Sequence, residues 1–122
     1  MIFLAVNCGN KMLIFLTGST GFVGKQLCAD LESSGHDIKC LSRNTVALET
    51  SYIDKLVYGD IESVDEWAAS LVGCDVLIHL AARVHVMNDQ SSDPLGDYRK
   101  TNTAATLDIA HAAVKAGVKR FI

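Results

Sequence analysis

Short apolar runs alternate along this chain with longer segments in which apolar residues recur every three or four positions. Four of the runs have the length of buried strands, namely residues 12–15, 38–41, 55–58 and 76–82. The last of these is continuously apolar and rich in β-branched residues, which indicates a central strand covered on both faces. A fifth strand is expected at residues 118–122.

Three segments between these runs predict helices with one buried face. The first begins at Phe22, and its expected apolar stripe is Phe22, Val23, Leu27, Cys28 and Leu31. The second has the stripe Val64, Trp67, Ala68, Leu71 and Val72. The third begins near Tyr98, and the residues expected to share a face are Leu107, Ala110, His111 and Val114. The small residues that let this helix lie close to a sheet are Ala105, Ala112 and Ala113.

Each predicted helix ends on a glycine, and an apolar strand begins within a few residues of Gly35, Gly73 and Gly117. This alternation is typical of βαβ units, so we expect an α/β fold with helices on both faces of a parallel sheet. Right-handed crossovers favour a Rossmann-type, doubly wound sheet in the order 3-2-1-4-5, with its ligand at the carboxyl ends of the strands. We assign residues 12–122 to this domain, incomplete at its fifth strand, and residues 1–11 to an extension of uncertain structure.

Composition fits one globular domain of 122 residues, with 49% apolar and 20% charged residues. A net charge of -3 argues against a general nucleic-acid or anionic-membrane binder. The four cysteines lack CxxC spacing and sit mostly in apolar stretches, which indicates buried free thiols in a reducing compartment. Because residues 2–6 are too short for a signal-peptide core or a membrane span, we expect a cytoplasmic location.

Three glycines follow the first predicted strand at three-residue intervals, where the chain turns into the first helix. Gly18 would allow the tight turn, Gly21 would let the backbone approach a phosphate, and Gly24 would permit close helix packing. Thr17 and Ser19 add hydroxyl groups that a phosphate site could use. The pattern alone is weak, because an ordinary βα turn can carry the same glycines, but the strand before it and the helix after it favour a nucleotide site.

Four motifs occur in order: Thr17-Gly18-x-x-Gly21-x-x-Gly24, Gly59-Asp60, His79-Leu80-Ala81-Ala82 and Asn102-Thr103-x-x-Thr106. In this order and spacing the chain resembles the extended short-chain dehydrogenases/reductases, in the branch of nucleotide-sugar epimerases, dehydratases and 4-ketoreductases. The resemblance covers residues 12–122. It implies that NAD or NADP binds here.

The resemblance places the pyrophosphate at Gly18, Gly21, Phe22, Val23 and Gly24. It places Asp60 and Ile61 beside the adenine. It places Leu80, Ala81 and Ala82 along the ribose and nicotinamide half of the cofactor. Asn102 would lie on the helix beneath this site, and Ser19 completes the expected set at the turn.

The end of the second strand bears on the choice of cofactor. An acidic residue there would accept hydrogen bonds from the ribose of NAD, but the chain has Ser42 and Arg43 instead. Arginine can pair with the 2′-phosphate of NADP, so NADP is slightly favoured over NAD. The alternative is a solvated loop arginine.

His79 lies within an apolar run, which favours a hydrogen-bonded core histidine over a catalytic one. The other histidines, His36, His85 and His111, show no metal-ligand spacing, and the aspartates of the loop at 83–97 lack a ligand pattern. We therefore expect no metal site. This loop is long enough to contact a substrate.

Enzymes of the resembled family use a tyrosine base activated by a lysine four residues later. Here the residues four positions after Tyr52, Tyr58 and Tyr98 are Leu56, Glu62 and Asn102. We therefore expect the dinucleotide-binding portion of a nucleotide-sugar enzyme, inactive by itself, with no catalytic residue of its own. The alternative is a non-catalytic NAD(P)-binding regulatory or sensor module. Apolar helix faces and an open sheet edge also predict self-association.

Overall fold

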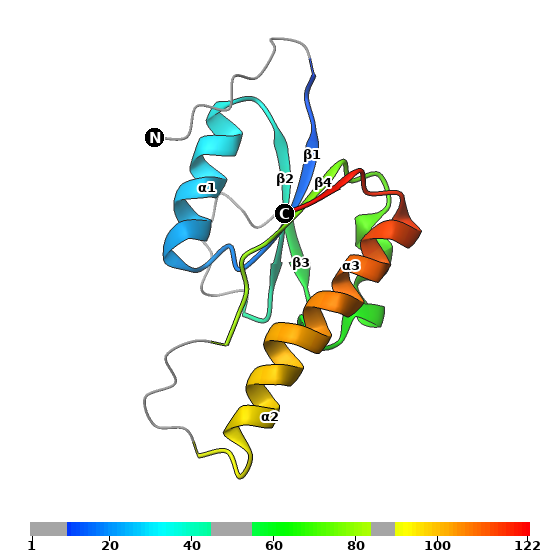
Figure 1. The fold of residues 1–122 in the computed structure, drawn as a ribbon. Coiled ribbons are helices and arrows are strands. Elements are labelled where there is room, and N and C mark those ends of the chain that lie inside the picture. Colours follow the sequence, from blue (N-terminus) through cyan, green and yellow to red (C-terminus); the bar gives the residue numbers. More distant parts are fainter. Residues whose placement is uncertain (1–9, 45–54, 84–89) are drawn as a thin grey trace.

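A computed structural model of the chain describes residues 10–44, 55–83 and 90–122 (Figure 1). Most of the expected extension, the segment at 45–54 and part of the loop at 83–97 lie outside these residues, and so does Cys8. Five parallel strands form one sheet in the order β3-β2-β1-β4-β5. The expected Rossmann-type order is thus confirmed.

The strands are β1 (Leu13–Thr17), β2 (Asp37–Ser42), β3 (Leu56–Tyr58), β4 (Val76–His79) and β5 (Arg120–Phe121). β1 is central and pairs with both β2 and β4. At its carboxyl end, Thr17 is the register partner of Leu41 on one side and of His79 on the other. β4 ends at His79, three residues earlier than the apolar run predicts, and residues 80–83 form irregular chain.

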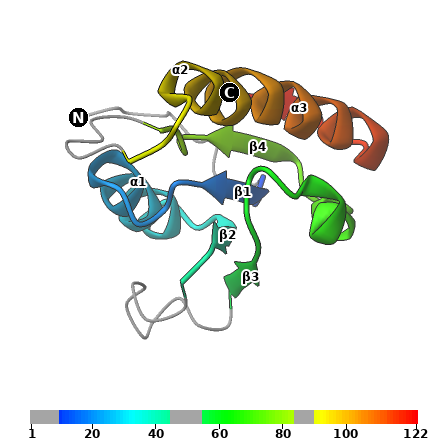
Figure 2. The same cartoon turned by 90° about the horizontal axis from the view of Figure 1, so that it is seen from below.

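Helices cover both faces of the sheet (Figure 2). The α-helix α1 (Phe22–Ser33) packs against Ile14 and Leu16 of β1 through Cys28 and Leu31. On the opposite face, α3 (Ala105–Ala116) packs against Phe15 of the same strand. Because successive strand residues point to opposite faces, β1 contributes to both hydrophobic cores.

Trp67 organises the core between the sheet and α3. It is 2% exposed, and its ring stacks on Phe15 with 5.3 Å between centroids and 10° between planes. Its indole nitrogen donates a hydrogen bond to the carbonyl oxygen of Asp60, at 2.8 Å. The tryptophan therefore also fixes the chain that leaves β3.

The predicted second helix is wrong in type. Two 3₁₀ turns, η3 (Val64–Glu66) and η4 (Ala68–Leu71), replace it. Trp67 lies between them with φ -128°, outside the helical region, which interrupts the helix where the indole enters the core. Val64, Trp67 and Leu71 are buried as expected, whereas Val72 is exposed.

Two predicted helix faces also need correction. Phe22 and Val23 begin α1 but are exposed, because the first turn of this helix extends past the sheet. In α3 the buried residues are Ala105, Ile109 and Ala113, one helical turn apart, while Leu107 and Val114 are exposed. The predicted face did not include Ile109, which is 0% exposed, so the buried side of the helix was assigned wrongly.

The third helical region begins earlier than Tyr98 and has three parts. α2 (Pro94–Arg99) is capped by Asp93, whose carboxylate accepts a hydrogen bond from the backbone N–H of Gly96. The π-helical segment η5 (Lys100–Ala104) joins it to α3. Single π-helical turns are rare and occur often at functional sites.

The structure also bears on the expected thiols. Cys28, Cys40 and Cys74 are free and buried, as predicted.

None of the helices in the described residues is long and apolar enough to span a membrane. Within the same residues, no group of three or more histidine, cysteine or acidic side chains could hold a metal ion.

Candidate functional site

A cleft of about 710 Å³ lies at the carboxyl ends of β1, β2, β3 and β4, where the topology changes direction. In open α/β sheets ligands bind at such switch points. Its lining residues are Gly18, Thr20, Gly21, Phe22, Val23, Gly24, Leu41, Ser42, Arg43, Asn44, Gly59, Asp60, Ile61, Glu62, Leu80, Ala81, Ala82, Arg83 and Thr101.

The cleft contains every predicted site residue except Ser19 and Asn102. Ser19 is 2% exposed, because its side chain points below the turn into the protein. Thr20 lines the cleft beside it. Asn102 faces the backbone of Arg83 instead of the cleft.

The turn from β1 into α1 leaves no room for a side chain at two of its three glycines. Gly18 has φ +74°, and a Cβ there would lie 2.7 Å from the backbone nitrogen of Ala81. A Cβ on Gly24 would lie 2.1 Å from the carbonyl oxygen of Gly18. Both positions therefore require glycine, Gly18 for its conformation and for space, Gly24 for space alone.

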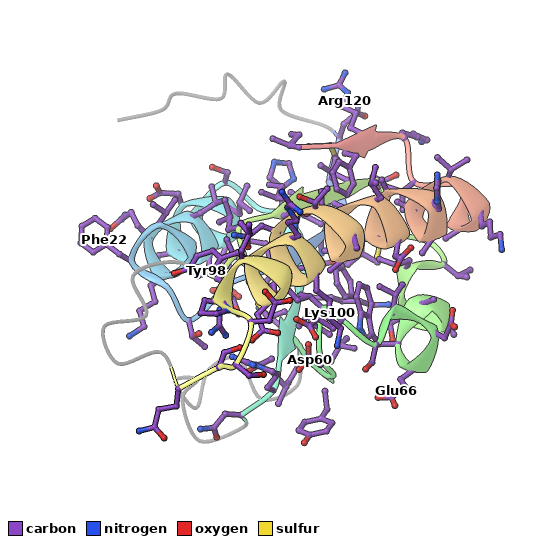
Figure 3. All side chains as sticks on the ribbon, turned by 60° about the horizontal axis from the view of Figure 1, so that its bottom comes forward. Phe22, Asp60, Glu66, Tyr98, Lys100 and Arg120 are labelled. Atoms are coloured by element: carbon purple, nitrogen blue, oxygen red, sulfur yellow. The ribbon has the colours of Figure 1, made fainter. Side chains whose placement is uncertain are left out.

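Gly21 differs from the other two glycines. A Cβ there would meet only the carbonyl oxygen of Gly18 within 4 Å, at 3.3 Å, which is tight but without the overlap found at Gly18 and Gly24. Gly21 is the N-cap of α1 and no side chain caps the helix. The first N–H groups of an α-helix lack intrahelical partners and carry partial positive charge, so the start of α1 can bind an anion. Figure 3 shows Phe22 projecting outward from this first turn.

Thr17 does not contribute its hydroxyl to the turn, contrary to expectation. It is 0% exposed and points between β1 and β4. Its oxygen lies 2.6 Å from Nδ1 of His79 and accepts a hydrogen bond from the backbone N–H of Ala81 at 3.2 Å. Strand alternation explains the direction, since Thr17 shares a sheet face with Phe15.

His79 is the hydrogen-bonded histidine that the sequence predicts. Its other ring nitrogen, Nε2, lies 3.0 Å from the hydroxyl of Thr106 on α3. Phe121 lies beside the ring, at 6.3 Å between centroids. Burial lowers the pKa of His79 below its usual value, which favours the neutral imidazole.

Two charged residues face one another at the ends of β2 and β3. Nη1 of Arg43 lies 3.8 Å from Oδ2 of Asp60, and the arginine side chain is 79% exposed. Such exposed, long ion pairs contribute little energy. Asp60 also accepts a hydrogen bond from the backbone N–H of Glu62, at 2.9 Å, so its carboxylate stays at the cleft mouth while Arg43 is able to turn.

Glu62 and Thr101 are cleft residues that the sequence reading missed. The hydroxyl of Thr101 donates to one carboxylate oxygen of Glu62, and Lys100 lies 3.2 Å from the other. The hydrogen bond from Thr101, followed by the hydrogen bond and charge of Lys100, lowers the pKa of Glu62. No sequence signal marks these contacts, because the partners are far apart in the chain and sit on ordinary surface positions.

Arg83 is a further cleft residue that the sequence did not predict. Its guanidinium lies over the ring of Tyr98 on α2, 5.3 Å from the centroid, in a cation–π arrangement. The side chain therefore has a defined position at the end of the cleft where β4 leads out. Only the fold brings Tyr98 beneath it.

Comparison with known protein families matches residues 14–122 to the NAD dependent epimerase/dehydratase family. UDP-glucose 4-epimerase of Vibrio cholerae is 41% identical to the chain over 110 residues, which are 89% of this chain and 33% of that protein. A 3 beta-hydroxysteroid dehydrogenase/Delta 5-->4-isomerase of Mycobacterium tuberculosis is 32% identical over 113 residues, with 89% and 30% covered. The chain thus spans about a third of the length of these relatives.

Solved structures agree with this assignment. The crystal structure of a dTDP-glucose 4,6-dehydratase from Streptomyces venezuelae, with NAD bound, superposes with a TM-score of 0.69 at 27% identity. The match covers 90% of this chain and 38% of that one.

Proposed function

This chain belongs to the NAD-dependent epimerase/dehydratase family, and on that premise we propose that its cleft binds NAD or NADP, with the diphosphate at the start of α1. The observation that carries this proposal is the turn at residues 18–24. Three glycines in this turn expose backbone to the cleft, and the turn places the uncapped end of α1 there. A diphosphate needs N–H donors and close backbone approach, which this turn supplies.

The size and chemistry of the cleft fit a dinucleotide. Its volume lies within the range of about 300–1,000 Å³ that is usual for ligand sites. Polar chain ends at Ser42 and Asp60 lie on one side of the turn and the small residues Ala81 and Ala82 lie on the other. This distribution suits an adenosine half near β2 and β3 and a nicotinamide half near β4.

The residues have separate tasks in this proposal. Asp60 and Ile61 flank the adenine, and Leu80, Ala81 and Ala82 pack along the ribose and nicotinamide. Asn102 acts indirectly, through the backbone of Arg83. Bound NAD or NADP would supply or accept a hydride.

Arg43 supports a modest preference for NADP. No acidic residue follows β2 at Ser42 and Arg43, and the long ion pair with Asp60 leaves the guanidinium able to meet a 2′-phosphate. The solved relative with NAD bound supports binding of NAD as well. We therefore infer that both cofactors bind and that NADP binds somewhat more tightly.

The whole protein is proposed to act on a nucleoside-diphosphate sugar by hydride transfer at a sugar carbon, as an epimerase, dehydratase or 4-ketoreductase. The names of the epimerase and dehydratase relatives support this substrate class. No tyrosine of the chain has a lysine four residues later, so we propose that these residues bind cofactor without turnover. The second candidate is a regulatory NAD(P)-binding module, which the lack of a lysine four residues after any tyrosine also supports.

Calorimetric titration with NAD and NADP tests the binding proposal. Gly21→Val adds bulk at the turn against one tight contact, with the carbonyl oxygen of Gly18, and is expected to abolish binding while the chain stays folded. Ala29→Val adds the same methyl groups to the exposed face of α1 and should leave binding intact. Equal binding by both variants would refute the assigned position, and absence of binding by the unmodified chain would refute the function.

A further inference from the structure

A continuous line of hydrogen bonds crosses the sheet directly beneath the cleft. It runs from the backbone N–H of Ala81 through the hydroxyl of Thr17, the ring of His79 and the hydroxyl of Thr106 to the carbonyl oxygen of Asn102. The line joins β1, the chain after β4 and the π-helical segment η5. One end, Ala81, lines the cleft, and the other, Asn102, holds the backbone of Arg83, which also lines it.

The direction of each hydrogen bond follows from the carbonyl oxygen of Asn102, which can only accept. The hydroxyl of Thr106 donates its single proton to the carbonyl oxygen of Asn102, at 3.1 Å. It can therefore only accept from His79, so Nε2 carries the ring proton. A neutral imidazole has one N–H, and Nδ1 is consequently an acceptor.

The other half of the line is then determined too. Nδ1 of His79 accepts the hydroxyl proton of Thr17, at 2.6 Å. The oxygen of Thr17 remains free to accept the N–H of Ala81, at 3.2 Å. Every donor in the line has one acceptor, and only the neutral Nε2–H form of His79 satisfies all of them.

We propose that His79 is a positioning residue for cofactor binding, whose neutral Nε2–H ring holds Ala81 and the π-helical segment in the geometry that the cleft requires. The inference rests on the proposed function. Ala81 is the residue whose backbone nitrogen closes against Gly18, and Asn102 holds Arg83 by two hydrogen bonds. Displacing the ring thus disturbs the side of the cleft that follows β4.

Protonation of His79 breaks this arrangement. A second ring proton turns Nδ1 into a donor that faces the hydroxyl proton of Thr17, and this proton has no other acceptor in the line. The groups around the ring are the hydroxyls of Thr17 and Thr106 and the ring of Phe121. Burial lowers the pKa of His79, and the two hydroxyls and the aromatic ring that face it carry no charge to offset an added proton.

Cofactor titration of the 122-residue chain across pH tests the proposal. Affinity should fall about tenfold for each pH unit below the pKa of His79 in the cofactor-free protein, and should be constant near pH 8. His79→Gln, which keeps a donor and an acceptor but cannot titrate, should bind more weakly with no such fall. His111→Gln, on the exposed side of α3, should keep the pH profile of the unmodified chain.

Nitrogen-15 resonances of the imidazole ring test the assignment without any variant. We expect His79 near pH 8 to show a protonated Nε2 and an unprotonated Nδ1. The opposite tautomer, or a charged ring at this pH, would overturn the proposal. Thr17→Val should shift this signature and weaken binding, while Thr17→Ser, which keeps the hydroxyl, should restore both.

The outcomes separate this inference from the proposed function. Binding at pH 8 that is unchanged at low pH overturns the role of His79 and leaves cofactor binding standing. A chain that binds neither NAD nor NADP at pH 8 overturns both.

Discussion

The side chain of Asn102 brackets the backbone of Arg83. Its Oδ1 accepts a hydrogen bond from the N–H of Arg83 at 2.7 Å, and its Nδ2 donates to the carbonyl oxygen of the same residue at 2.9 Å. A primary amide is the side chain that offers one donor and one acceptor in this spacing. The π-helical segment thereby fixes the chain that leaves β4, where the cleft ends.

We expect Asn102→Ala to lower the free energy of unfolding by about 1–2 kcal/mol, because two partly buried backbone groups lose their partner. Asn102→Asp should also destabilise, since its carboxylate cannot donate to the carbonyl oxygen. Thr103→Ala, at the exposed neighbouring position, is the control. Urea denaturation measures the free energy of unfolding of the three variants. Equal stability of the Asn102→Ala variant and the unmodified chain would contradict a stabilising role for the two hydrogen bonds between Asn102 and Arg83.

Arg43 is expected to raise the affinity for NADP over that for NAD. Arg43→Gln should weaken NADP binding about tenfold, which is the loss of one charge-assisted hydrogen bond, and should leave NAD binding nearly unchanged. Ser42→Asp should shift the preference toward NAD, because an acidic residue here can accept from the ribose hydroxyls. Paired titrations with NAD and NADP decide the question. Comparable affinity of the unmodified chain for NAD and NADP, or tighter binding of NAD, would contradict the proposal that Arg43 favours NADP.

Glu62 makes stability depend on pH in the acid range. Its folded pKa is below the ordinary value of 4.5, so the folded state holds its proton less tightly than the unfolded state does. The contribution is fully present above 4.5 and is lost as pH falls through the lowered pKa. The stability difference between the unmodified chain and Glu62→Gln should therefore shrink on acidification, as unfolding at several pH values would show. Glu66→Gln, at another exposed position, is the control variant.

The outer face of α3 predicts association between copies of the chain. Leu107 and Val114 are 56% and 77% exposed, and they lie two helical turns apart on one side of the helix. Replacing both with lysine should reduce self-association in sedimentation velocity, whereas Val72→Lys at another exposed site should not. A single monomeric species for the unmodified chain would count against this prediction.

The order of the sheet could be predicted from sequence because it depends on local signals that repeat. Glycines end the helices, apolar runs begin the strands, and right-handed crossovers leave few arrangements. The buried face of α3 could not be deduced in the same way. Alanine-rich helices are apolar on several sides, and only the contact of Ile109 with the sheet core decides which side is covered.

The candidate site was predictable where it depends on backbone space, and less so where it depends on contacts between distant side chains. Gly18 and Gly24 follow from a turn that tolerates no Cβ. Thr17 and Ser19 carry hydroxyls in the right place along the chain, but strand alternation and burial turn both away from the cleft. Thr101 reaches Glu62 only because the π-helical segment passes over the end of β3.

The start of α1 is proposed to hold the diphosphate of a bound dinucleotide. Backbone amide resonances recorded during titration with NAD test it most directly. The amides of Phe22, Val23 and Gly24 should shift in proportion to bound cofactor, and those of Lys119 and Arg120, at the opposite end of the sheet, should not move. Shifts confined to residues outside the turn, or no shifts at saturating NAD, would contradict the account.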